Sequence, residues 1–112
     1  MPCIPRLLAR AGPPALAAIC SISVSSCVSM DTIAPPVTPA LLSASRGHSA
    51  QTIEEGRRIF VGACTACHTA DPVSAYSVEK WRIIVADMAE RTKLTPTREA
   101  ALNAYITAAL SR

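Results

Sequence analysis

The chain has 112 residues, half of them hydrophobic, and a formal net charge of +3 at pH 7. This length allows at most one small domain and excludes a multidomain enzyme and a polytopic membrane protein, and the low charge excludes a highly charged nucleic-acid-binding protein. Most prolines lie in the first 39 residues, whereas all four aromatic residues follow residue 59. The chain therefore divides into a leader with a linker and a compact C-terminal part.

The first 26 residues have the pattern of a secretory signal peptide. Arg6 and Arg10 give a positive start, and no charged residue occurs from Ala11 to Met30. Prolines and serines make this stretch a poor permanent membrane span, although an uncleaved anchor is an alternative. Val24-Ser25-Ser26-Cys27 resembles the lipobox of bacterial lipoproteins. We therefore predict a lipoprotein-type signal peptide over 1–26 and acylation of Cys27; otherwise Cys27 is one more small residue at the end of the signal.

Residues 27–50 have no sustained hydrophobic period and are rich in Pro, Ser, Ala and Thr. This composition is typical of a flexible tether. We expect a lipid-anchored linker between a membrane and a domain over 51–112, with a fully extended reach of about 75 Å. The protein is then exported and periplasmic, and it is held at the membrane by its N-terminal lipid.

The first predicted helix covers about residues 53–63. Ile53, Gly56, Phe60 and Ala63 recur at three-to-four-residue spacing, and Thr52-Ile53-Glu54-Glu55 is a capping box. The domain has fewer than 70 residues, a size at which one apolar core rarely gives enough stability without a staple.

Cys64-Thr65-Ala66-Cys67-His68 follows this helix and is the C-x-x-C-H attachment site for c-type haem. The thiols of Cys64 and Cys67 can add to the two haem vinyl groups, and His68 can then bind the iron as the proximal ligand. A single covalent haem c with its iron would also supply the missing staple, because its apolar faces give short helices a surface to bury against.

Three other interpretations of the two cysteines fit less well. A structural zinc site normally needs four Cys or His ligands, and the domain offers only Cys64, Cys67, His68 and the distant His48. A thioredoxin-like pair should follow a strand in a βαβ unit, but no alternating strand pattern lies nearby. A simple disulfide would leave His68 unexplained.

The second predicted helix follows Ser77, with Val78, Trp81, Ile84, Val85 and Met88 on its apolar side. Met88 is the predicted distal iron ligand, since a thioether is a common partner to histidine in electron-carrying cytochromes. Its alternative role is an ordinary core methionine; His48, Lys93 or an open sixth position are the other possibilities. Trp81 is a candidate donor to a haem propionate, with plain core packing as the alternative.

The third predicted helix begins at Thr95-Pro96 and places Leu102, Tyr105, Ile106 and Ala109 on one face. Together with the other two helices it makes the predicted fold all-α, with three main helices. No strand pattern competes with this assignment.

Residues 51–112 resemble the class I c-type cytochromes. The resemblance rests on Gly56-Arg57-Arg58-Ile59-Phe60, followed at the family's spacing by Cys64, Cys67 and His68, and on an aromatic residue in the C-terminal helix. It implies a small cytochrome c-like domain around one haem, in which Phe60 and Tyr105 pack where the first and last helices cross. Met88 departs from the pattern, because the family's distal methionine generally lies in a loop farther from the haem motif.

The expected function is electron transfer between redox proteins in the periplasm, with no nucleic acid or small-molecule substrate as a partner and no catalysed reaction. Two alternatives remain open. An open distal iron site would suit a haem-based gas sensor or a peroxidase-like protein. The chain could also be a haem subunit of a membrane redox complex.

Overall fold

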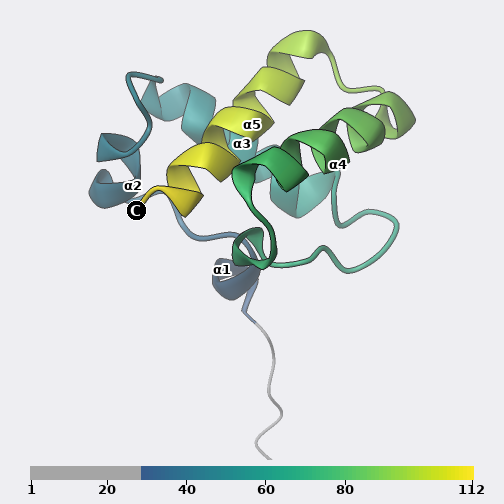
Figure 1. Ribbon diagram of the computed structural model, residues 1–112, viewed down its shortest axis with the longest axis horizontal. Coiled ribbons are helices and arrows are strands. Elements are labelled where there is room, and N and C mark those ends of the chain that lie inside the picture. Colours follow the sequence, from purple (N-terminus) through teal and green to yellow (C-terminus); the bar gives the residue numbers. More distant parts are fainter. Residues whose placement is uncertain (1–28) are drawn as a thin grey trace, which may run out of the picture.

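The computed structural model describes residues 29–112, and this range folds into five α-helices and one short 3₁₀-helix without any β-strand. The all-α class predicted from the sequence is therefore confirmed. Three helices are long: α3 (Ala50–Gly62), α4 (Val78–Thr92) and α5 (Pro96–Leu110). Helix α5 packs against both α3 and α4 (Figure 1). None of the helices in this range is long and apolar enough to cross a bilayer.

The starts of the long helices are set by hydroxyl side chains. Ser77 and Thr95 cap α4 and α5 by accepting hydrogen bonds from the backbone N–H groups of Lys80 and Arg98, as predicted. Helix α3 begins earlier than predicted. Its cap is Ser49, whose hydroxyl lies 3.1 Å from the backbone nitrogen of Thr52, so the predicted capping box at Thr52 is wrong.

The centre of the core is the crossing of α3 and α5. Phe60 and Tyr105 are fully buried there, with ring centroids 6.3 Å apart in an edge-to-face arrangement. Gly56 lies against the backbone of α5: a Cβ at this position would be 2.6 Å from the Cβ of Tyr105 and would overlap the carbonyl oxygen of Ala101. The predicted contact of Phe60 with Tyr105, and the need for glycine at position 56, are both confirmed.

Residues 29–50 differ from the predicted flexible linker. They form α1 (Met30–Ile33) and α2 (Pro39–Ser43), and three of their apolar side chains, Ile33, Ala34 and Leu41, are buried in the main core. These segments are too short to show a helical period in the sequence, and burial of their few apolar residues holds them in place. The predicted signal peptide over 1–26 and the predicted lipid site at Cys27 lie outside the described residues.

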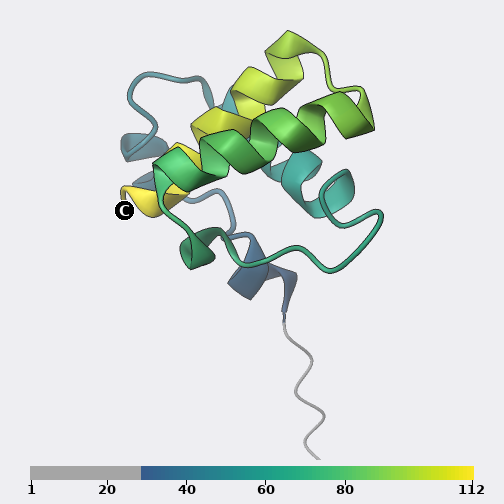
Figure 2. The same ribbon diagram turned by 45° about the vertical axis from the view of Figure 1, so that its right-hand side comes forward.

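Arg57 and Tyr105 fasten this N-terminal segment to the helices. The Nε of Arg57 donates to the carbonyl oxygens of Ala34 and Pro35 at 3.2 and 3.1 Å, and its Nη2 lies 2.8 Å from a carboxylate oxygen of Asp31. The buried Tyr105 hydroxyl donates to the same Pro35 carbonyl at 2.7 Å. As a result α1 lies next to the 3₁₀-helix η1 (Val73–Ala75), at one end of the molecule (Figure 2).

Replacing Tyr105 with phenylalanine tests this attachment. Burial raises the pKa of Tyr105 from 10.0 to about 12, so the folded chain keeps the phenolic proton to a higher pH than the unfolded chain does. This contribution to stability is complete below pH 10 and is lost as the pH rises from about 10 to about 12. We expect Tyr105→Phe to lower the free energy of unfolding by about 1 kcal/mol at pH 7. We also expect it to flatten the alkaline decline, measured by urea denaturation at a series of pH values; an equally steep decline would contradict the assignment.

Candidate functional site

A cavity of about 420 Å³ lies between α4, α5 and the loop that connects α3 to η1. This volume falls within the range of small-molecule and cofactor sites. Four residues selected from the sequence line it together: Cys64, His68, Trp81 and Met88. The remaining lining residues are mostly apolar and are Phe60, Ala70, Asp71, Tyr76, Ile83, Ile84, Val85, Asp87 and Ile106.

The two motif cysteines follow the C-terminal end of α3. The helical turn continues into the motif, because the backbone N–H groups of Ala63 and Cys64 both donate to the carbonyl of Ile59, at 2.8 and 3.3 Å. Cys64 is half-buried at the cavity wall, whereas Cys67 is exposed and is not part of the lining. Both thiols are free, and burial raises the pKa of Cys64. Cys64 is therefore a protonated thiol at neutral pH rather than an activated thiolate.

His68 reaches the cavity from the exposed part of the same loop. Its Nδ1 lies 3.0 Å from the carbonyl oxygen of Thr69. When Nδ1 carries the proton and donates it to this carbonyl, Nε2 keeps its lone pair. Metal-binding histidines commonly have this arrangement, because the backbone acceptor fixes both the tautomer and the orientation of the ring.

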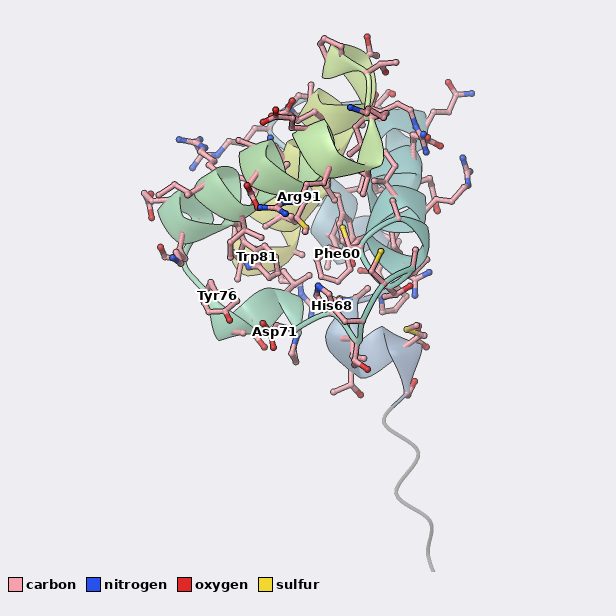
Figure 3. The ribbon with its side chains drawn as sticks, turned by 90° about the vertical axis from the view of Figure 1, so that its right-hand side faces the viewer. Phe60, His68, Asp71, Tyr76, Trp81 and Arg91 are labelled. Carbon is pink, nitrogen blue, oxygen red and sulfur yellow. The ribbon has the colours of Figure 1, made fainter. Side chains whose placement is uncertain are left out.

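Met88 comes to the cavity from α4, so it lies on a different element from His68. On this helix Trp81 and Val85 are buried in the core, and Ile84 and Met88 are half-buried against the cavity. The side chains of His68, Phe60 and Trp81 surround the same space (Figure 3). The structure therefore brings together the histidine and the methionine that were predicted as axial ligands.

Trp81 has a different hydrogen-bond partner from the predicted one. Its indole N–H donates to the carbonyl oxygen of Val73 at 2.7 Å, in a buried position. The donor is thus already used to hold η1 against α4, which argues against the predicted contact with a haem propionate. The indole ring also packs edge-to-face on Phe60, with centroids 5.5 Å apart, and forms part of the cavity wall.

One feature of the cavity was missed by the sequence reasoning. The hydroxyl of Tyr76 donates to Asp71 Oδ2 at 2.7 Å, and both residues line the cavity. The two residues frame the loop that leads into η1, so their hydrogen bond closes this loop on itself. The only sequence signal is a tyrosine five positions after an aspartate, which no helix or strand period distinguishes.

Among residues 29–112, no three His, Cys, Asp or Glu side chains gather into a group that could hold a metal ion. Comparisons with known protein families, with curated proteins and with solved structures found no match to this chain.

Proposed function

We propose that this protein is a monohaem c-type cytochrome that carries single electrons between redox proteins. The observation that supports this most strongly is the convergence on one largely apolar cavity of Cys64, His68 and Met88, which come from two separate parts of the chain. The cavity fits a flat apolar cofactor, since Phe60, Trp81 and Ile106 supply apolar walls.

Each group has a definite role in this proposal. Cys64 and Cys67 form the thioether bonds, His68 binds the iron through Nε2, and Met88 is the second axial ligand. When bound, haem supplies reversible one-electron chemistry at iron. The protein excludes water with the cavity walls and holds the His68 ring through its contact with Thr69.

The setting of Cys64 argues against the main competing chemistry of a C-x-x-C pair. Thiol–disulfide oxidoreductases need a thiolate, which a helix N-terminus stabilises by lowering the thiol pKa. Cys64 instead follows the C-terminal end of α3, where the helix dipole disfavours an anion, and burial raises its pKa further. A thiol that stays protonated is suited to becoming a permanent thioether rather than to rapid exchange.

The fold of residues 29–50 sharpens the proposed membrane anchoring. Because this segment packs on the domain, only three residue steps separate the proposed lipid site at Cys27 from Met30 in α1. Three steps span at most about 11 Å. An acylated Cys27 would hold the domain close to the membrane surface, which favours membrane-embedded redox partners. Mass spectrometry of the mature N-terminus tests the acylation.

Replacing Met88 with alanine tests the second axial ligand. We expect the variant to lose the thioether-to-iron absorption band of the oxidised protein, and to bind carbon monoxide rapidly and completely when reduced, because the position opposite His68 becomes open. The band should be present in the parent protein and lost only when the sulfur is removed. Absorption spectroscopy of both redox states measures both effects.

Ile83→Ala is the matched control for this variant. Ile83 also lies on α4 and lines the cavity, but it is 66% exposed and has no atom that binds iron. It should keep the parent spectrum. An unchanged spectrum in Met88→Ala, or rapid carbon monoxide binding by the parent protein, would remove Met88 from the ligand set and favour a gas sensor or a peroxidase-like protein.

A further inference from the structure

All four aromatic residues of the chain form one continuous series of contacts. Successive ring centroids are 5.3 Å apart from Tyr76 to Trp81, 5.5 Å from Trp81 to Phe60 and 6.3 Å from Phe60 to Tyr105, and all three pairs are edge-to-face. The series runs along the cavity wall, with Tyr76 at one end beside Asp71 (Figure 3). Core packing explains Phe60 and Tyr105, but it does not explain why a polar pair lies at the cavity end.

The two tyrosines differ in what receives their hydrogen bond. Tyr76 is half-exposed and donates to a carboxylate oxygen of Asp71 at 2.7 Å. Tyr105 is fully buried and donates to the carbonyl oxygen of Pro35. A phenol that loses an electron becomes strongly acidic and must release its proton. A carboxylate can take up that proton, whereas a peptide carbonyl cannot.

We propose that Tyr76 and Asp71 form a proton-coupled redox site that accepts oxidising equivalents through Trp81. A one-electron oxidant removes an electron from Trp81, and Tyr76 then replaces that electron. In the same step the O–H bond of Tyr76 breaks and a new O–H bond forms on Asp71 Oδ2. The products are the reduced oxidant, a neutral tyrosyl radical and a protonated Asp71, so charge and protons balance.

The location of the pair gives it a function. Trp81 is 5% exposed, borders the cavity and contacts both Phe60 and Tyr76, so it links the cavity wall to the molecular surface. An oxidising equivalent generated in the cavity would leave through Trp81 to Tyr76, where external reductants can reach it. This route would spare Cys64 and Met88, whose sulfur atoms are the oxidation-sensitive groups of the cavity. The redox site consists of protein groups and does not depend on bound haem.

The test uses the mature, oxidised protein with flash-photolysed tris(bipyridine)ruthenium(II) and a cobalt(III) pentammine quencher, which together supply the one-electron oxidant. Samples with ring-deuterated tyrosine are rapidly frozen, and electron paramagnetic resonance distinguishes tyrosyl from tryptophanyl radicals. We expect a tyrosyl radical in the parent protein. Tyr76→Phe should abolish it and leave the radical on Trp81, the only tryptophan in the chain.

Two further variants separate proton transfer from mere exposure. Asp71→Asn keeps a hydrogen-bond acceptor but removes the base, so it should lower the tyrosyl yield at least about tenfold. Tyr105→Phe should leave the yield unchanged. An undiminished yield in Asp71→Asn, or loss of the signal in Tyr105→Phe, would overturn the proposal. Circular dichroism checks the fold of each variant, and the absorption spectrum of the same samples reports haem, so a failure of the proposed cytochrome function would be recognised separately.

Discussion

Alanine at both Cys64 and Cys67 should abolish covalent haem attachment completely. The reason is chemical: thioether bonds to the haem vinyl groups require these two sulfur atoms, and no other cysteine lies in the described domain. Haem staining of a denaturing gel is the direct measurement, because only covalently bound haem migrates with the chain. Each single variant should keep one thioether bond and a weaker stained band.

Cys3→Ala is the matched cysteine control. Cys3 falls within the predicted signal peptide, so its loss should leave the staining of the mature chain at the parent level. Staining that persists in the double variant would contradict the assignment of Cys64 and Cys67. Staining that is absent from the parent protein as well, when it is produced in cells that mature c-type cytochromes, would contradict the proposed cofactor itself.

Gly56→Ala should destabilise the protein by at least about 3 kcal/mol. The added methyl group would overlap the Ala101 carbonyl oxygen and come within 2.6 Å of the Tyr105 Cβ. The backbone of α5 cannot rotate away as a flexible side chain would, so α3 and α5 must separate and the packing of Phe60 against Tyr105 loosens. Urea denaturation followed by circular dichroism measures the loss.

Gly62→Ala provides the comparison within the same helix. Gly62 ends α3, is exposed, and has nothing within 4 Å of the position of an added Cβ. Alanine there should leave the stability unchanged or raise it by up to about 1 kcal/mol, because it reduces the freedom of the unfolded chain. Equal effects of the two substitutions would show that α3 and α5 do not cross closely at Gly56.

The three long helices were predictable because each carries a sustained apolar pattern, and α4 and α5 also carry a clear capping residue. Ser77 and Thr95 stand directly before these helices, and both cap them in the structure. The start of α3 was misplaced, since Ser49 and Thr52 are both good capping residues and Ser49 lies nearer the preceding turn. Local sequence alone does not decide between two such neighbours.

The folding of residues 29–50 could not be predicted, for a different reason. Helices of four or five residues show no period, and the prolines that indicate a tether also permit short helices, as Pro39 does at the start of α2. What holds this segment is tertiary: Arg57 and Tyr105, far away in the sequence, donate to its carbonyl groups.

The candidate site divides in the same way. Cys64, Cys67 and His68 form a contiguous motif, and Met88 has a distinctive side chain, so the sequence was enough to select them. The Trp81 bond to the Val73 carbonyl and the Asp71–Tyr76 pair depend on how the loop around η1 folds back on α4. No local pattern encodes that return, and so both hydrogen bonds emerged only from the structure.

The most direct test of the central proposal is the absorption spectrum of the full chain, produced in cells that mature c-type cytochromes and denatured before measurement, together with a count of free thiols. We predict a c-type haem spectrum that remains with the denatured chain, and no thiol at Cys64 or Cys67 that reacts with an alkylating reagent. A colourless protein in which both thiols are alkylated would contradict the account.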